Sequence, residues 1–197
     1  TGRGLVMLHK LSTHIAQQLL ANGVISDDDF ELYEFSAFCF LFNLIPLGLS
    51  IAIGTALNMF WKSILFIIPY VSIRTFSGGF HFKSAKLCFL VTNMILFFSL
   101  IITKKMICIG RSTIFLALIL LASLTVFLLS PIDSDARKLT SSETSAFRRV
   151  ARYLVITFLA IDLVLYYLGI FSAAYPIGMG IALTAALQLP CCIRVKS

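Results

Sequence analysis

Hydrophobic residues in this chain are gathered into six long runs separated by short polar or basic segments. The runs cover about residues 35–58, 60–73, 87–103, 112–130, 150–171 and 173–193. Because an α-helix rises about 1.5 Å per residue, roughly 20 apolar residues cross the hydrocarbon core of a bilayer. The pattern therefore predicts an all-α fold, a polytopic transmembrane helical protein with about six membrane segments.

Three features modify the simplest reading of these runs. The run over 60–73 is short and carries Lys62 near its start, so it spans a bilayer only if that side chain snorkels or if flanking residues lengthen the helix. Pro46 and Pro176 lie inside the first and last runs. Neighbouring helices can satisfy the carbonyls that proline leaves free, so both helices are expected to kink rather than end.

Residues 1–34 are predicted to form an amphipathic N-terminal region, cytoplasmic or interfacial, ahead of a membrane domain over 35–197. Leucine and isoleucine recur at helical spacing over residues 5–20, with histidine, lysine and glutamine between them. This pattern favours a helix that lies on the membrane surface or docks on a partner. Asn22-Gly23 ends it, and Ser26 with Asp27 offers N-cap chemistry for the helix that enters the membrane.

The composition excludes a water-soluble domain. Hydrophobic residues make up 59% of the 197 residues and charged residues only 13%, and the mean hydropathy is +0.96. Ordinary soluble domains are about 25% charged. A bilayer removes lipid-facing side chains from water without a large packed interior.

The charges argue against a nucleic-acid-binding protein, and the cysteines argue against a disulfide-stabilised one. The net charge is +7, but the cations sit between apolar runs, so they are expected to set topology rather than to bind nucleic acid. Five cysteines are an odd number, and some lie in or beside apolar stretches, so no disulfide framework is expected. Cys191-Cys192 fits juxtamembrane acylation or simple packing.

Counting cations between the runs predicts the orientation. With six spans, one side of the membrane receives twelve lysine and arginine residues and the other receives four. Since positive charge is retained in the cytoplasm, both termini and the loops after the second and fourth runs are expected there. The twelve are Arg3, Lys10, Arg74, Lys83, Lys86, Arg137, Lys138, Arg148, Arg149, Arg152, Arg194 and Lys196, and the four are Lys62, Lys104, Lys105 and Arg111.

The segment between the second and third runs, residues 74–88, holds the best candidate chemistry. It contains His81 and, seven residues later, Cys88. A cysteine is a good nucleophile as its thiolate, and a neighbouring base or cations favour that form. His81 can take the proton, while Arg74, Lys83 and Lys86 raise the local positive potential.

Glycines and geometry add two expectations for this segment. Gly78-Gly79 lets a backbone approach a bound peptide closely, or offers N–H groups to a developing oxyanion. In a straight helix a spacing of seven residues separates two side chains by about 10.5 Å along the axis, whereas proton transfer needs about 3 Å. If the two residues act together, the stretch 76–87 therefore cannot be one uninterrupted helix, and His81 is predicted to lie on a loop or re-entrant turn folded back over the start of the helix bearing Cys88.

Other readings of these residues remain open. A cysteine at a helix start can be inert packing, and a lone His–Cys pair falls short of the four ligands of a zinc site, so no metal or cofactor is expected. Asp162 lies within the fifth run, where it is either a structural carboxylate or part of a proton or ion relay. A small peptide transporter or exporter without proteolytic activity, and a scaffolding membrane protein, are the alternatives to an enzyme.

The residues Arg74, Gly78, Gly79, His81 and Cys88, set between two hydrophobic segments, resemble the signature of the accessory gene regulator B (AgrB) family of membrane peptidases. The amphipathic helix before an acidic stretch and the first span agrees with this resemblance.

A second stretch extends the resemblance over nearly the whole chain. The sequence Ser-Pro-Ile-Asp over 130–133 is followed by the basic pair Arg137-Lys138, after the fourth run. Leu139 departs from the pattern, since many members carry proline after that pair. The departure concerns this loop and not the family.

The resemblance implies a bacterial cell-membrane cysteine endopeptidase with Cys88 as nucleophile and His81 as general base. It would cleave a quorum-sensing propeptide through a thioester and support closure to a thiolactone or lactone autoinducing peptide. Such propeptides carry an amphipathic leader and an acidic C-terminal tail, and members are expected to be homodimers. Arg74 would orient the loop, bind an acidic group or stabilise the oxyanion, or else simply anchor a helix end. The N-terminal helix is the candidate contact for the leader, or a plain surface anchor.

Overall fold

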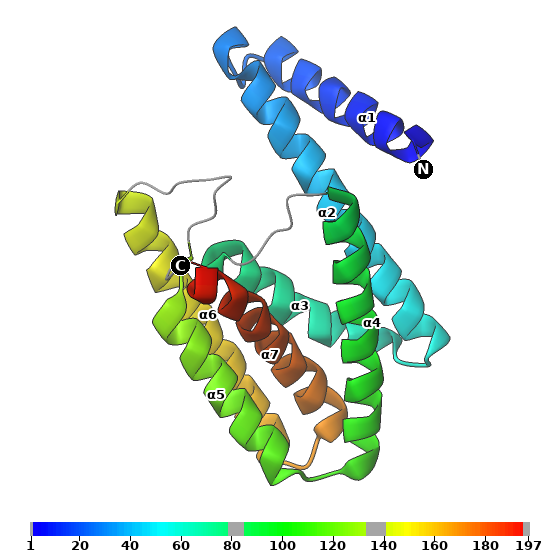
Figure 1. The fold of residues 1–197 in the computed structure, drawn as a ribbon, viewed down its shortest axis with the longest axis vertical. Helices are drawn as coiled ribbons and strands as arrows, with labels where there is room; N and C mark the ends of the chain where they lie inside the picture. The colour runs from blue at the N-terminus through cyan, green and yellow to red at the C-terminus, as the bar shows by residue number, and fades with distance from the viewer. Residues whose placement is uncertain (1, 79–84, 133–140, 195–197) are drawn as a thin grey trace. The chain divides into compact units, whose positions relative to one another are not determined.

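The computed structural model describes residues 2–78, 85–132 and 141–194 of the chain. Every regular element in these ranges is helical, which confirms the predicted all-α class (Figure 1). Two compact units, residues 1–49 and 50–197, are described separately. The helices are α1 (Gly2–Ala21), the short 3₁₀ helix η1 (Asp27–Asp29), α2 (Phe30–Ala56), α3 (Phe60–Ser77), α4 (Ala85–Ile109), α5 (Thr113–Leu129), α6 (Ser141–Tyr167) and α7 (Phe171–Arg194).

In the first unit, α1 lies against the beginning of α2. The Thr13 hydroxyl donates to the Glu34 carboxylate, and the His9 ring meets the Phe38 ring edge to face at a centroid distance of 6.4 Å. The helix ends where predicted, because Gly23 adopts a left-handed φ of +67° that leaves the helical path. Ser26 does precede η1, but its hydroxyl donates to the Asp29 carboxylate at 2.7 Å and caps no backbone N–H.

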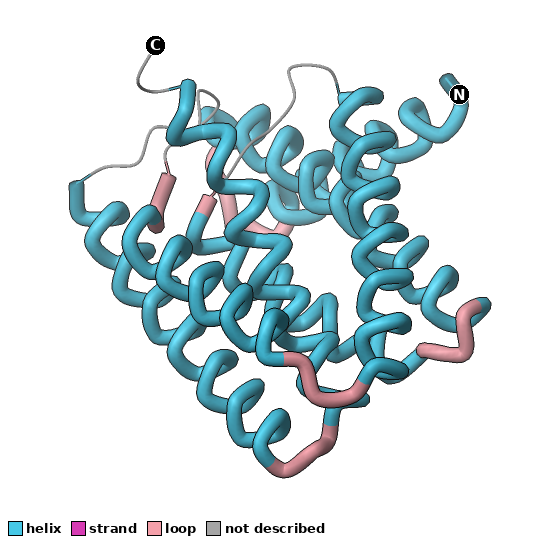
Figure 2. The backbone as a smooth tube through the Cα atoms, turned by 60° about the horizontal axis from the view of Figure 1, so that its bottom comes forward, coloured by secondary structure: helices cyan, strands magenta, loops and turns pink. Residues whose placement is uncertain are grey.

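In the second unit, α7 is the central helix. It packs against α3, α4, α5 and α6, and 67% of its apolar window is buried, against 19–22% for the other long apolar helices (Figures 1 and 2). Small residues on α7 make this possible, since helices in membranes associate by close van der Waals contact. A Cβ at Gly180 would lie 2.7 Å from the Phe66 carbonyl oxygen, and one at Gly178 would lie 2.6 Å from Ile119 Cδ1.

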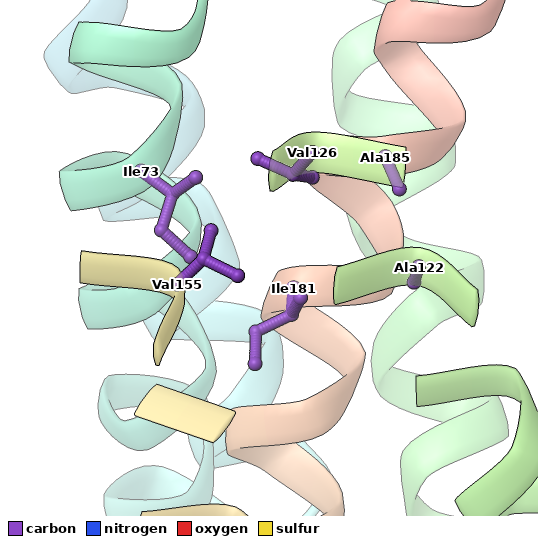
Figure 3. Packing of buried hydrophobic residues seen from close by; sticks show 6 residues of the cluster. All are labelled: Ile73, Ala122, Val126, Val155, Ile181 and Ala185. Carbon is purple, nitrogen blue, oxygen red and sulfur yellow. The ribbon is translucent and has the colours of Figure 1, made fainter. Parts of the chain in front are cut away.

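Four helices meet in the core of this unit (Figure 3). Their contributions are branched or small side chains, and the two residues from α5 and the two from α7 are each four positions apart, which places each pair on one helix face. The buried cluster consists of Ile73 from α3, Ala122 and Val126 from α5, Val155 from α6, and Ile181 and Ala185 from α7. Many other large apolar side chains of these helices are exposed, as expected of surfaces that face lipid.

Among the residues that the structure describes, four helical stretches are long and apolar enough to cross a membrane, while α5 is apolar but shorter. The four are Asp27–Ala56, Phe89–Ile109, Thr144–Tyr167 and Phe171–Pro190. The number of six membrane segments stays a prediction. Helices α2 and α7 continue through Pro46 and Pro176, so neither proline ends its helix.

The start of α6 differs from the pattern of hydrophobic residues. The apolar run begins near residue 150, but the helix is already formed at Ser141. Arg148, Arg149 and Arg152 therefore lie on helical turns rather than in a loop. Hydropathy marks the part of a helix that prefers lipid, whereas the helix itself continues until a breaker interrupts its hydrogen bonds, and neither proline nor glycine occurs within α6.

Helix ends of the second unit contact one another at two places. At one place the residues after α3 and after α5 meet, because Gly78 forms a backbone bridge with Ile132. At the other place the Tyr175 hydroxyl donates to the Gly110 carbonyl, and the Arg111 guanidinium lies 5.9 Å from the centre of the Tyr166 ring. Successive helices thus run in alternating directions, as a polytopic protein requires.

Candidate functional site

The stretch expected to carry the chemistry is interrupted as predicted. Helix α3 ends at Ser77 and α4 begins at Ala85, so residues 76–87 do not form one continuous helix. Cys88 and Lys86 belong to the first turn of α4 by their backbone. Gly79, His81 and Lys83 lie outside the described residues, and so do the side chains of Lys86 and Cys88. The approach of His81 to Cys88 stays a prediction.

Arg74 lies in the last turn of α3 and is partly buried. A cation at this position is favourable because the carbonyl end of a helix carries partial negative charge. Its backbone carbonyl accepts the N–H of Gly78 at 3.2 Å, which closes the helix. The interpretation of Arg74 as a helix-end anchor therefore has a direct physical basis, and its part in orienting the loop or binding substrate stays a prediction.

Gly78 lies where two backbones come very close together. Its φ is +70°, a conformation that side chains with a Cβ rarely adopt, and a Cβ here would collide with the Ile132 carbonyl oxygen. The Ile132 N–H donates to the Ser77 carbonyl at 3.0 Å, which completes the contact. The backbone that approaches Gly78 in the structure is that of Ile132, and the expected approach to a bound peptide stays a prediction.

Gln188 on α7 was not among the residues predicted to matter, yet it joins this contact. Its side chain is fully buried, and its amide nitrogen donates to the Ser77 carbonyl at 3.3 Å and to the Ser130 hydroxyl at 3.0 Å. The sequence did carry a signal, because Gln188 is an isolated amide in an otherwise apolar run. Nothing local, however, indicates which distant groups such an amide will meet.

Asp162 is 1% exposed on α6. Neither carboxylate oxygen has a hydrogen bond of ideal geometry among the described residues, but the backbone N–H of Gly178 on α7 interacts with this carboxyl group. A Cβ at Gly178 would lie 2.8 Å from its Oδ1, which shows that α7 packs directly on this carboxyl group. Ionisable groups buried among membrane helices are costly and are often functional.

A bundle of long apolar helices packed around a central helix with small residues at its contacts defines a polytopic α-helical membrane protein. Residues 12–190 match the family model of AgrB, accessory gene regulator B, which covers most of the chain. The chain belongs to this family, and membership implies processing of an autoinducing-peptide precursor, the AgrD propeptide. Comparisons with curated proteins and with solved structures gave no match.

Proposed function

We propose that this protein is a cysteine endopeptidase of the bacterial cell membrane, in which Cys88 is the nucleophile and His81 its general base. The observation that carries the proposal is the family match over residues 12–190, which contains both residues. The position of Cys88 supports it, since the first turn of a helix favours an anion and therefore a thiolate. The end of α3 at Ser77 supports it too, because an unbroken helix would hold the two residues apart.

In this reaction His81 takes the thiol proton while the Cys88 sulfur attacks the scissile carbonyl of the propeptide. The carbon–nitrogen bond then breaks, the proton passes to the departing amine, and the C-terminal tail leaves. The remaining peptide is held as a thioester on Cys88. A thiol or hydroxyl within that peptide attacks the thioester, closes a thiolactone or lactone ring, and frees Cys88. Because one thioester replaces another when the ring closes through sulfur, closure depends mainly on positioning.

The proposed substrate carries an amphipathic leader and an acidic C-terminal tail. The acidic tail matches the basic side of the chain, which includes Arg148 and Arg149 at the exposed start of α6. Arg74, Lys83 and Lys86 would add to the positive electrostatic potential of that side. Gly78-Gly79 would supply backbone N–H groups or room for the peptide. The active form is proposed to be a homodimer.

The proposed topology has six crossings, formed by α2 to α7, with both termini and the loop bearing His81 in the cytoplasm. Helix α3 has 18 residues and α5 has 17, so each spans about 25–27 Å, slightly less than a typical hydrocarbon core. Lys62 lies in the first turn of α3, where a lysine can reach the interface. The excess of cations on the proposed inner side supports this orientation.

Reconstituted protein tests the proposal. The purified chain in lipid vesicles should release a C-terminal fragment from the synthetic AgrD propeptide of the same organism. Cys88→Ala and His81→Ala should each abolish release, and a thioester-linked adduct should form on the wild type alone. Normal cleavage by both variants would show that the catalytic assignment is wrong.

A peptide transporter is the second candidate, favoured by one observation. Asp162 is a carboxyl group buried among apolar helices, as groups along ion pathways often are. Uptake of propeptide by proteoliposomes that survives Cys88→Ala but not Asp162→Asn would support transport. Fragment release without uptake would exclude it.

A further inference from the structure

Gln188 has an unusual position for an amide. It lies two residues before the end of the apolar stretch Phe171–Pro190 of α7, is 0% exposed, and reaches two different chain segments at once. One is the carbonyl of Ser77, the last residue of α3, and the other is the hydroxyl of Ser130, which follows α5. The direction of the amide is fixed, because only its nitrogen can donate to a carbonyl.

The Ser77 carbonyl is also the acceptor for the N–H of Ile132, at 3.0 Å. Two donors from different parts of the chain thus converge on one oxygen, and the Gly78–Ile132 bridge lies beside it. Hydrogen bonds in a low-dielectric interior are strong. Removal of one partner leaves the other buried without a hydrogen bond, and this unsatisfied group destabilises the fold. Gln188 therefore holds the end of α3 in register with the residues that follow α5.

We propose that Gln188 is a positioning residue for the peptidase site, because its amide fixes Ser77 and Gly78, from which the chain continues to His81. This inference rests on the proposed function. Gln188 does not react with substrate. It acts through the backbone that leads to the general base, and a displacement of about 1 Å in a reacting group is enough to slow a reaction strongly.

The other amide atom, Oε1, is buried and accepts no hydrogen bond from any residue in the described ranges. A methionine would fill the same space without an unpaired acceptor, so packing alone does not account for glutamine here. The donor function of the amide does account for it.

The experiment compares three variants of the full chain in lipid vesicles, with the synthetic propeptide as probe. Gln188→Met keeps the volume and removes the donor. It is expected to lower kcat for fragment release by about tenfold with KM within about twofold, and to slow iodoacetamide alkylation of Cys88. Thr184→Val is the matched control, since Thr184 is buried one turn away and its hydroxyl donates within α7, to the Gly180 carbonyl. It is expected to retain wild-type kcat.

Gln188→Glu separates positioning from stability. A protonated carboxyl can donate to the Ser77 carbonyl and an ionised one cannot, so the activity of this variant relative to wild type should fall reversibly as pH rises. Because ionisation of a buried carboxyl also lowers stability, the midpoint of thermal unfolding is measured at each pH, and positioning predicts that kcat falls while the protein is still folded at the assay temperature. A ratio that stays constant with pH, a loss of activity that coincides with unfolding, or a wild-type kcat in Gln188→Met would overturn the inference while Cys88→Ala remains inactive. Fragment release that persists in Cys88→Ala would instead overturn the proposed function, and the role of Gln188 with it.

Discussion

The backbone of Gly78, at the end of α3, pairs with the backbone of Ile132, just after α5, so closely that position 78 has no room for a Cβ. The bridge joins the two polar segments that follow the second and fourth hydrophobic runs. In a polytopic protein these segments belong on the same side of the membrane. The Gly78–Ile132 contact therefore brings two such segments together, at the residue where the proposed catalytic loop begins.

Gly78→Ala should destabilise the protein and reduce fragment release. A Cβ at a φ of +70° costs about 1–2 kcal/mol, and the collision with the Ile132 carbonyl adds to that cost. The midpoint of thermal unfolding in detergent measures the effect. Gly23→Ala is the control, because Gly23 shares the positive φ of +67° but no atom lies within 4 Å of its added Cβ. Equal losses in the two variants would show that the bridge contributes nothing.

Gly180→Ala should loosen the packing of α7 on α3. The added methyl would lie 2.7 Å from the Phe66 carbonyl oxygen and 2.8 Å from Pro69 Cγ, and overpacking of this kind costs about 1–3 kcal/mol. Gly48→Ala in α2 meets open space, so it is expected to leave stability unchanged or to raise it by about 0.5–1 kcal/mol. The midpoints of thermal unfolding of both variants in the same detergent measure these effects. An unchanged midpoint in Gly180→Ala would contradict the tight contact.

Ile181→Ala should be strongly destabilising, since Ile181 is fully buried in the cluster shared by four helices. Large-to-small changes at such sites cost about 2–5 kcal/mol. Leu121→Ala on α5 is the matched change at a side chain that is 63% exposed, where lipid fills the space, and it should cost well under half as much. Unfolding by denaturant in mixed micelles measures the difference. Similar losses at the two positions would mean that α7 is not the central helix.

Cys88 and Cys108 should be labelled from opposite sides of the membrane. Both belong to α4, near its first and last residues, and twenty residues of helix separate them by about 30 Å. Cys108 is a free, exposed thiol. In single-cysteine variants, a membrane-impermeant maleimide is expected to label Cys108 in intact cells and Cys88 in inside-out vesicles. Labelling of both from one side would contradict the proposed crossing of α4.

Much of the helical framework could be predicted from the hydrophobic pattern. The run over 112–130 corresponds to Thr113–Leu129, and the run over 60–73 corresponds to the longer Phe60–Ser77. The agreement was poorest at α6, which begins at Ser141, well before its apolar run. The polar turns of that helix contain no breaker, and hydropathy cannot register a helix that continues out of the bilayer.

One part of the candidate site could likewise be predicted from the sequence, and another part could not. The break between α3 and α4 followed from the spacing of His81 and Cys88, because a side chain cannot reach another across two helical turns. The role of Gln188 could not be predicted, since its partners Ser77 and Ser130 are far from it in sequence. Hydrogen-bond chemistry at one position does not specify a distant partner.

The sequence by itself determined that this protein resides in a lipid bilayer, where its helices approximately begin and end, and to which family it belongs. These properties follow from the transfer free energy of side chains and from local helix geometry, which act residue by residue. Only the tertiary structure decided that α7 lies at the centre, that Gly78 meets Ile132, and that Gln188 joins α3 to the end of α5. Lipid-facing and helix-facing surfaces are similarly apolar, so shape and interhelical hydrogen bonds select the neighbours of each helix.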